Sequence, residues 1–381
     1  MRSRMSPQHY LCTDIFEQEQ QKIFKKLWLF AGLKTMLPRT NSFVTRKMSG
    51  IPVVIQRFED GIRAFENICL HRSATLQTAA AGCRPLVCPY HAWSYKPDGS
   101  LLNIPACDKL YRLEESEKSR LRLRQFALRE VGNLLFINLA DDPLPLEEQF
   151  DSGFLKSLEE SSAQYDTEVM VTTWHGKFNW KLAYENLRDA NHPRFVHPQS
   201  LAKSVDFVPT VDEAAAAESL NELPDSTREG LRAEMQRFSF GGADAPIPDM
   251  HRFAWHEMVN RFGDEDVYYN WLAFPNLHIA SPNGGLSFTL EYHIPIAPDR
   301  TDIEIYWFSA RKSRGYKYSS NVLLAQMHGS KLVVGEDVAV MESVQAALHP
   351  GAPVSTQGDY ESMNRLVERW YVALLKDEHG I

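Results

Sequence analysis

Two short loops that each carry one cysteine and one histidine constrain this chain more than any other feature of its sequence. They are Cys69-Leu70-His71 and Cys88-Pro89-Tyr90-His91, and 16 residues separate His71 from Cys88. A zinc finger usually takes its two thiolates from one knuckle and its two imidazoles from another. Because each loop here supplies one of each, the spacing favours a [2Fe–2S] cluster whose irons bind two thiolates and two imidazoles, respectively. A structural zinc site, or cysteines packed in a core, are the alternatives.

The composition is that of an ordinary globular protein, and it argues against several functional classes. The 381 residues are 44% hydrophobic and 24% charged, and the net charge of −8 disfavours a nucleic-acid binder. No apolar run reaches the roughly 18 residues of a membrane span, and no apolar stretch of a secretory signal follows the first residues. Five cysteines are too few for a disulfide framework, so we expect a cytoplasmic protein in which Cys12, Cys83 and Cys107 are ordinary thiols.

The sequence pattern predicts a small β-rich domain followed by a larger domain in which strands precede long helices. We expect a helical N-terminal segment over 1–40 that packs on the larger domain, an all-β domain over 41–145, and the larger domain over 146–381. The expected helices are 14–30, 181–190, 321–348 and 360–376, and the expected late strands are 268–272, 277–281, 287–296 and 302–310. Residues 200–250, rich in Ala, Glu, Asp, Gly and Pro, are expected to form a long, partly mobile excursion.

A second group of candidate metal ligands lies in the stretch 179–197. Asp189 and His192 are three residues apart and share one face of the predicted helix, and Pro193 loosens the chain so that His197 can turn toward the same point. Two histidines and one carboxylate with open positions form the facial triad of non-haem Fe(II) oxygenases. Two such histidines alone are more often solvated or packed in a core, so the pattern gains its weight from the Cys/His loops upstream.

The carboxylate of this triad has to come from a distant part of the chain. In the segment 333–345, Asp337 shares a helical stripe with Met341 and Val344 and should point inward. A buried, otherwise unpaired carboxylate is costly, and metal coordination would offset that cost. We therefore predict Asp337 as the third ligand and keep Glu336 as the alternative ligand.

These segments resemble motifs of the large (alpha) subunits of Rieske-type ring-hydroxylating oxygenases. Residues 67–72 together with 88–93 resemble the cluster motif, and residues 179–197 resemble the stretch that binds the mononuclear iron. Respiratory Rieske proteins have two further cysteines where this chain has Ala74 and Tyr90, so the oxygenase type is favoured.

Three positions depart from the family's usual pattern. Ser73 and Ala92 stand where the family often has glycine, and Asn191 stands where many relatives have an aromatic residue. Because Ser73 and Ala92 are both small, we expect the cluster to assemble. Asn191 could reshape the entrance of the pocket.

The resemblance implies an α+β fold in which an all-β Rieske [2Fe–2S] domain is inserted in a helix-grip (START-like) catalytic domain, whose antiparallel sheet is covered by helices. The implied ligands are Cys69, His71, Cys88 and His91 for the cluster, and His192, His197 and Asp337 for a mononuclear Fe(II). It also implies that Asp189 is a catalytic residue that connects to a Rieske histidine of the neighbouring subunit in a ring-shaped homotrimer. The expected substrate-pocket residues are Asn186, Leu187 and Asn191, with Trp271, His278 and Phe288 as weaker candidates.

The chain contains no G-x-G-x-x-G dinucleotide turn, so NAD(P)H is expected to act only through a separate reductase, with or without a ferredoxin. A small beta subunit is a further possible partner. The resemblance implies a terminal oxygenase that hydroxylates a small organic, aromatic substrate with oxygen from O2. The alternatives are an O- or N-demethylating Rieske monooxygenase, a Rieske electron carrier with a ligand-binding domain and no catalytic iron, and a zinc-stabilised interaction protein.

Overall fold

The computed structural model describes residues 1–221, 228–310 and 319–376, and its internal contacts divide the chain into two units. Unit 1 consists of Met1–Ile23 and Leu144–Ile381, and unit 2 consists of Phe24–Pro143. Both units contain antiparallel sheets, and unit 1 adds long helices, so the expected α+β class is confirmed. No helix in the described part of the chain is long and apolar enough to cross a membrane.

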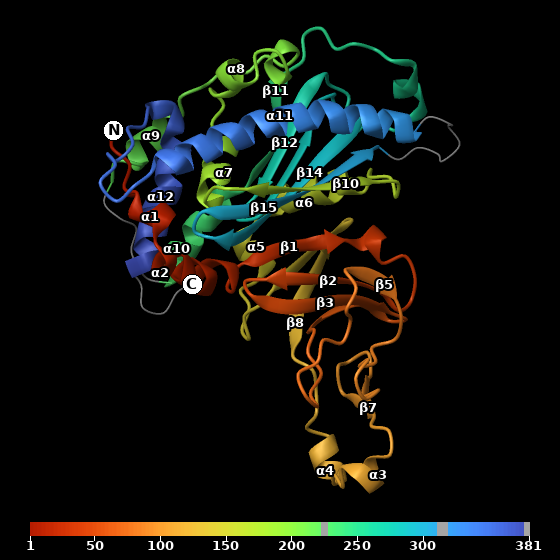
Figure 1. Ribbon diagram of the computed structural model, residues 1–381. Coiled ribbons are helices and arrows are strands. Elements are labelled where there is room, and N and C mark those ends of the chain that lie inside the picture. The colour runs from red at the N-terminus through yellow and green to blue at the C-terminus, as the bar shows by residue number, and fades with distance from the viewer. Residues whose placement is uncertain (222–227, 311–318, 377–381) are drawn as a thin grey trace. The chain divides into compact units, whose positions relative to one another are not determined.

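Unit 2 is built on a seven-stranded antiparallel sheet in the order β1-β9-β8-β4-β3-β2-β5. The strands are β1 (Trp28–Leu33), β2 (Ser42–Met48), β3 (Ile51–Phe58), β4 (Gly61–Glu66), β5 (Ala81–Cys83), β8 (Gln125–Val131) and β9 (Leu134–Asn138). A hairpin of β6 (Ser94–Tyr95) and β7 (Leu101–Asn103) precedes the short helices α3 (Cys107–Leu110) and α4 (Glu115–Lys118) (Figure 1). The core of this unit includes both cluster cysteines, Cys69 and Cys88.

The boundary near residue 40 differs from the expected one. The predicted helix over 14–30 is replaced by α1 (Gln8–Leu11), α2 (Thr13–Glu19) and a π-helical turn (Gln20–Phe24), after which the chain becomes strand β1. All six residues of β1 are buried, and β1 pairs with β9. A continuous apolar run suits a strand buried on both faces as well as it suits a helix. Residues 24–40 therefore belong with unit 2.

Unit 1 is built on a six-stranded antiparallel sheet in the order β10-β15-β14-β13-β12-β11. The strands are β10 (Met170–Gly176), β11 (Phe240–Pro246), β12 (Val267–Ala273), β13 (Leu277–Ser281), β14 (Ser287–Ala297) and β15 (Arg300–Ser309). The expected excursion over 200–250 is wrong in part, because β11 lies within it. Its sequence, Phe-Gly-Gly-Ala-Asp-Ala-Pro, has little β-propensity, and pairing with β12 holds it as an edge strand.

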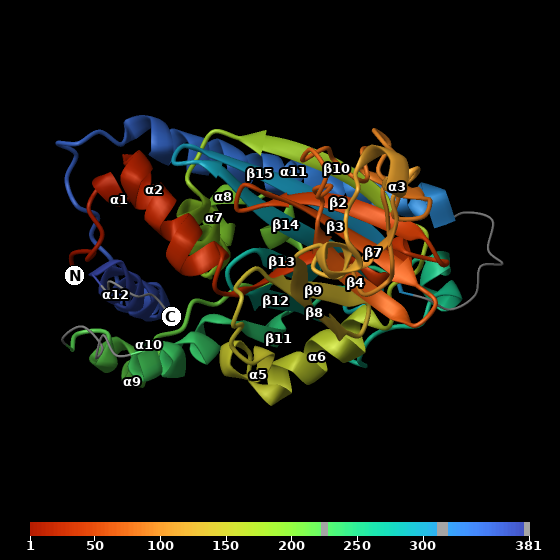
Figure 2. The same ribbon diagram turned by 90° about the horizontal axis from the view of Figure 1, so that it is seen from below.

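Helices complete unit 1. They are α5 (Leu146–Gln149), α6 (Ser152–Ser162), α7 (Trp180–Leu187), α8 (Pro193–Val196), α9 (Glu213–Glu218), α10 (Arg228–Met235), α11 (Ser319–Ala347) and α12 (Ser362–Lys376). The long helix α11 runs along the sheet and contacts β15 and β10 (Figure 1). Helices α1 and α2 lie beside α12, where Glu19 accepts a hydrogen bond from Tyr371 (Figure 2).

Candidate functional site

The two Cys/His loops of unit 2 adopt the same hydrogen-bonded turn. The amide of Cys69 donates to the carbonyl of Ala74 at 2.8 Å, and the amide of Cys88 donates to the carbonyl of Trp93 at 2.8 Å. Ser73 and Ala92 occupy equivalent positions with φ of 55° and 57°. This left-handed region favours glycine, which gives a physical reason for the glycine that the family often has at both positions.

The four candidate cluster ligands lie in two like pairs. The Nδ1 atoms of His71 and His91 are 3.1 Å apart, and Cys69 and Cys88 are buried and adjacent. Burial raises the pKa of the Cys69 thiol. Among the described residues, these four do not converge on a single point that one metal ion could occupy. A thiolate pair and an imidazole pair fit a [2Fe–2S] cluster and disfavour a zinc ion.

Tyr95 connects one cluster cysteine to the backbone of its own loop. The Tyr95 hydroxyl accepts a hydrogen bond from the amide of Leu70 at 3.0 Å and lies 3.2 Å from the Cys69 sulfur. A ligand thiolate can only accept, so the hydroxyl would donate to it. Burial raises the pKa of Tyr95, which keeps the hydroxyl protonated.

In unit 1, the structure brings His192, His197 and Asp337 together. Each offers one ligand atom, and these atoms lie within 4.8 Å of one another. The Oδ1 atom of Asp337 is 3.4 Å from His192 Nε2 and 3.0 Å from His197 Nε2. His192 stands at the start of α8, whose first residue is Pro193, and His197 stands at its end. The break before Pro193 thus turns both imidazoles toward α11, and this donor set fits Fe(II).

A carboxylate behind the candidate ligands orients one of them. Glu336 Oε2 lies 2.8 Å from His197 Nδ1 and accepts a hydrogen bond from the Ser200 hydroxyl at 2.6 Å. Because Glu336 faces Nδ1, it leaves Nε2 of His197 free to point at Asp337. This arrangement is that of an outer carboxylate which fixes a ligand's tautomer, so it supports Asp337 rather than Glu336 as the third ligand. The ligand assignment itself stays a prediction.

Contacts among His192, His197, Asp337 and Glu336 determine the charge of the triad. Burial disfavours charge on His197, but its hydrogen bonds to the Asp337 and Glu336 carboxylates outweigh this and raise the pKa of His197. Burial likewise opposes ionisation of Asp337, and the hydrogen bonds from His192 and His197 overcome it and lower the pKa of Asp337. The carboxylate is therefore held ionised, as a metal ligand must be.

The backbone of Asp189, and not its carboxylate, faces the ring of His192. His192 Nδ1 faces the backbone carbonyl of Asp189 at 2.6 Å. The Asp189 side chain instead accepts from the amides of Asn191 at 2.8 Å and His192 at 3.2 Å. Helix α7 ends at Leu187, so Asp189 lies in a turn where its carboxylate caps the following amides.

The three predicted pocket residues have different surroundings. Asn186 and Leu187 line the pocket beside the triad, and the Asn186 amide also donates to Asp337 at 3.0 Å. Asn191 is not among the lining residues, because its side chain hydrogen-bonds Tyr360. Of the weaker candidates, His278 lines the pocket, whereas Trp271 and Phe288 are buried core residues outside it.

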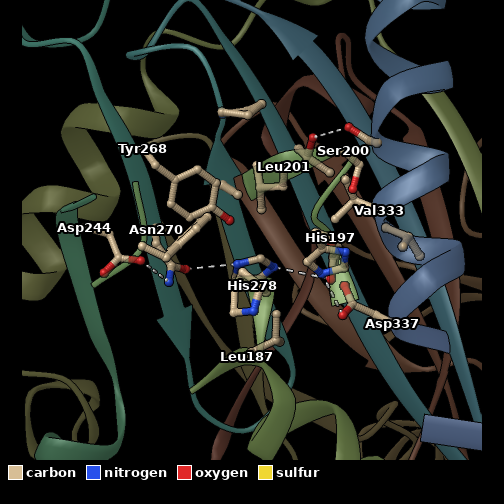
Figure 3. Close-up of a pocket in the computed structure, with 18 of the residues that line it drawn as sticks. Leu187, His197, Ser200, Leu201, Asp244, Tyr268, Asn270, His278, Val333 and Asp337 are labelled. Carbon is tan, nitrogen blue, oxygen red and sulfur yellow. Dashed lines mark hydrogen bonds and ion pairs between the residues drawn. The ribbon is translucent and has the colours of Figure 1, made fainter. Parts of the chain in front are cut away.

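The pocket has a volume of about 420 Å³ and lies between the sheet, α7, α8 and α11 (Figure 3). Its wall includes polar residues from neighbouring strands that the sequence did not single out: Asp244, Asn270 and Glu291. Asn270 and Glu291 alternate with buried apolar residues along β12 and β14, as positions on one sheet face do. This alternation is the sequence pattern from which both residues could have been predicted. Asp244 lies in a Gly/Ala/Asp/Pro-rich segment that has no such pattern.

Comparisons with known proteins find family models that match both parts of the chain. A family model of the Rieske [2Fe–2S] domain matches residues 27–126, and a model of the ring hydroxylating alpha subunit (catalytic domain) matches residues 160–377. The glycine betaine monooxygenase oxygenase subunit of Pseudomonas aeruginosa is 32% identical over 217 residues, which are 55% of this chain and 48% of that protein. The anthranilate 1,2-dioxygenase large subunit of Acinetobacter baylyi is 33% identical over 193 residues, which are 48% and 40% of the two chains.

The match to these curated relatives spans about half of their length or less. A solved structure of a quaternary ammonium Rieske monooxygenase in complex with its substrate L-carnitine superposes with a TM-score of 0.70 at 21% identity. It covers 97% of this chain and 95% of that one. At this identity the likeness concerns the fold alone.

Proposed function

The chain belongs to the family of ring-hydroxylating oxygenase alpha subunits, and from this membership we propose that it is the terminal oxygenase component of a reductase-dependent monooxygenase. The observation that carries the proposal is the presence in one chain of a paired Cys/His site and a separate two-histidine, one-carboxylate site within a pocket. An electron carrier would need the first site but not the second.

The residues fit the two groups that such an oxygenase uses. Cys69, Cys88, His71 and His91 would hold the [2Fe–2S] cluster, and His192, His197 and Asp337 would hold Fe(II). When bound, the cluster supplies single electrons and the mononuclear iron supplies dioxygen activation. Glu336 and the Asp189 carbonyl fix the two imidazole rings, and Asn186 holds the Asp337 carboxylate.

The reaction balances as R–H + O2 + 2 e⁻ + 2 H⁺ → R–OH + H2O. A C–H bond is broken, a C–O bond forms, and the second oxygen atom leaves as water. The two electrons come from a separate NAD(P)H reductase, with or without a ferredoxin. If the new hydroxyl is on an O- or N-methyl carbon, loss of formaldehyde completes a demethylation.

We favour monooxygenation over aromatic dihydroxylation because two of the matched proteins are monooxygenases of quaternary ammonium compounds. The polar wall of the pocket supports the same choice, since Asp244, His278 and Glu291 would bind a polar substrate better than a plain hydrocarbon. Hydroxylation of an aromatic substrate is the second candidate, and the similarity to an anthranilate dioxygenase favours it.

We further propose that Asp189 lies on the electron path to the mononuclear site, from a Rieske histidine of a neighbouring copy in a homotrimer. Its backbone carbonyl contacts the ring of His192, and its carboxylate accepts hydrogen bonds from the amides of Asn191 and His192. Asp189 also lines the pocket, so it is accessible beside the candidate iron ligands.

A turnover assay with ¹⁸O2 and a surrogate reductase tests the proposed function. The assay screens methylated amines, methoxy compounds and aromatic acids. One ¹⁸O atom in the product, or in the released formaldehyde, with two electrons consumed per turnover supports monooxygenation. Two ¹⁸O atoms in a dihydrodiol would support the aromatic candidate, and electron transfer without any oxygenated product would contradict both.

A further inference from the structure

Asp244 owes its place in the pocket to an irregularity in strand β11. Ala243 pairs with Tyr269 and Ala245 pairs with Tyr268, so Asp244 has no partner of its own on β12 and forms a β-bulge. A bulge redirects the side chain of the extra residue and is common beside active sites. Here it puts an exposed carboxylate on the wall of the pocket, at an edge strand of the sheet.

Asp244 begins a line of hydrogen bonds across the sheet. The Asn270 amide nitrogen donates to Asp244 Oδ2 at 3.2 Å, and Asn270 Oδ1 lies 3.0 Å from His278 Nε2 (Figure 3). Because a carboxylate can only accept, Asn270 must present its NH2 group to Asp244 and its oxygen to His278. The contact fixes the orientation of Asn270 and leaves the lone pairs of Asp244 that do not face it available to a ligand.

The other carboxylates of the described pocket wall are already engaged. Glu291 lies 3.3 Å from His278 Nδ1 and 3.4 Å from His293 Nε2. Asp337 contacts the two candidate iron-binding histidines, and Asp189 accepts two backbone amides. Asp244 has only a neutral amide as its donor within the described residues. The pocket wall partly removes this carboxylate from water and so raises the pKa of Asp244, and neither the Asn270 contact nor the nearby His278 offsets this.

The pocket wall also has a shortage of cations. Arg188 is its only lysine or arginine among the described lining residues. The Arg188 guanidinium donates to the Phe238 carbonyl at 2.6 Å and to the Tyr184 hydroxyl at 3.0 Å, and it stacks over the ring of Phe240. Nη1 of Arg188 is thus engaged by the protein. Against this one arginine the described wall has four carboxylates, Asp189, Asp244, Glu291 and Asp337, so it suits a cation better than an anion.

Asp244 is remote from the candidate iron ligands. It lies on β11, the edge strand at the end of the sheet opposite β10. Asp337 lies on α11, which contacts β15 and β10 at the other side of the sheet. In Figure 3 the two carboxylates accordingly stand at opposite ends of the labelled side chains.

We propose that Asp244 is a specificity-determining residue that binds a positively charged nitrogen of the substrate, away from the carbon that is oxidised. This inference rests on the proposed oxygenase function and names its substrate class: an elongated organic monocation. The charged nitrogen and the reacting carbon are then separated by the length of the pocket, so the oxidised carbon is not a methyl group of that nitrogen.

Binding of three probes of one shape and different charge tests the proposal. They are protonated 4-phenylbutylamine, neutral 4-phenylbutan-1-ol and anionic 4-phenylbutyrate, titrated calorimetrically into the holoenzyme. We expect the ammonium to bind at least about tenfold more tightly than the alcohol, and the carboxylate more weakly than either. Asp244→Asn should remove the preference for the ammonium and leave alcohol binding unchanged.

Two further variants serve as controls for the loss of a carboxylate. Asp244→Glu should keep a preference for the ammonium, and Asp249→Asn should behave like wild type, since Asp249 is an exposed carboxylate outside the pocket wall. The visible absorbance of the cluster checks that each variant is folded. An ammonium probe that fails to bind, that binds no better than the alcohol, or whose preference survives in Asp244→Asn overturns the proposal.

Dioxygen uptake with the same probes separates this proposal from the proposed function. If ammonium binding depends on Asp244 but no probe or screened compound is oxygenated, the recognition role stands and the oxygenase function fails. If the alcohol is oxygenated as well as the ammonium and Asp244→Asn changes neither, the oxygenase function stands and the recognition role fails.

Discussion

The hydroxyl of Tyr95 lies 3.2 Å from the sulfur of Cys69 while it accepts a hydrogen bond from the Leu70 amide. A hydrogen bond to a ligand sulfur withdraws charge from the cluster and so favours its reduced form. Tyr95→Phe should therefore lower the midpoint potential of the cluster. One neutral hydrogen bond corresponds to roughly 20–60 mV for a one-electron couple, measurable by spectroelectrochemistry.

Tyr111→Phe is a suitable control for this measurement. The Tyr111 ring packs edge-on against His71 and Trp93, but no hydroxyl contact to a cluster sulfur is found among the described residues. Removal of the Tyr111 hydroxyl should leave the midpoint potential of the cluster nearly unchanged. A potential that is equal or higher in Tyr95→Phe would show that the hydroxyl does not donate to the cluster.

Substitutions of Glu336 and of Asp337 should have different effects on the binding of the mononuclear iron. Asp337→Ala removes the predicted ligand, so the mononuclear iron should be lost while the cluster remains. Glu336→Gln weakens the support of His197 and should reduce iron affinity by roughly 10–100-fold without abolishing binding. Iron titration of the apo mononuclear site measures both. If Asp337→Ala keeps iron and turnover while Glu336→Ala loses both, the ligand assignment is reversed.

Asp189→Asn tests the electron path without removing the turn. The asparagine oxygen can still accept from the amides of Asn191 and His192, and the carbonyl at residue 189 is unchanged. We expect both metal centres to be retained and turnover to fall by roughly 10–100-fold or more because the charge is lost. Rapid mixing of the reduced enzyme with dioxygen follows cluster oxidation directly. Wild-type cluster oxidation and turnover in Asp189→Asn would refute the bridging role.

Glu185 should make the stability of the folded protein depend on pH. Burial raises the pKa of Glu185 to about 8, although Tyr10 donates a hydrogen bond to it at 2.7 Å. The folded state therefore binds a proton that the unfolded state releases near pH 4.5. Its stabilising contribution is complete below that pH and is lost as the pH rises to about 8.

In Glu185→Gln the side chain is neutral at every pH, so this contribution to the pH dependence of stability should disappear. Thermal melts of both proteins at matched scan rate between pH 5 and 9 give the comparison. We expect the variant to gain stability relative to wild type as the pH rises across this range. If the difference in melting temperature between the two proteins were the same at every pH, the pKa of Glu185 would not be raised in the folded state.

Local motifs explain why much of the molecule could be predicted from its sequence. The Cys/His loops place their ligands within a few residues, and β12 to β15 have strong apolar patterns that gave their approximate positions. Family membership and the α+β class were confirmed. Asp337 could be paired with the histidines only because its helical stripe and the family resemblance pointed to the same residue.

The features that were missed depend on tertiary contacts or on unusual backbone. β1 forms because β9 pairs with it, which no local pattern could distinguish from a helix. Asn191 contacts Tyr360 and lies outside the pocket wall, in a stretch where the chain has left α7 at Leu187, earlier than the expected end of that helix. Asp244 reaches the pocket through a bulge in a strand of poor β-propensity, and a bulge is fixed by its pairing partner.

The iron and acid-labile sulfide content of the anaerobically purified chain shows whether it holds both kinds of metal centre. Two metal centres of the proposed kinds require about three Fe and two sulfides per chain, and His197→Ala should lower this to two Fe and two sulfides. We expect this loss of one Fe with unchanged cluster absorbance. A wild-type protein that holds only two Fe per chain after reconstitution with Fe(II), or a colourless protein that holds zinc, would contradict it.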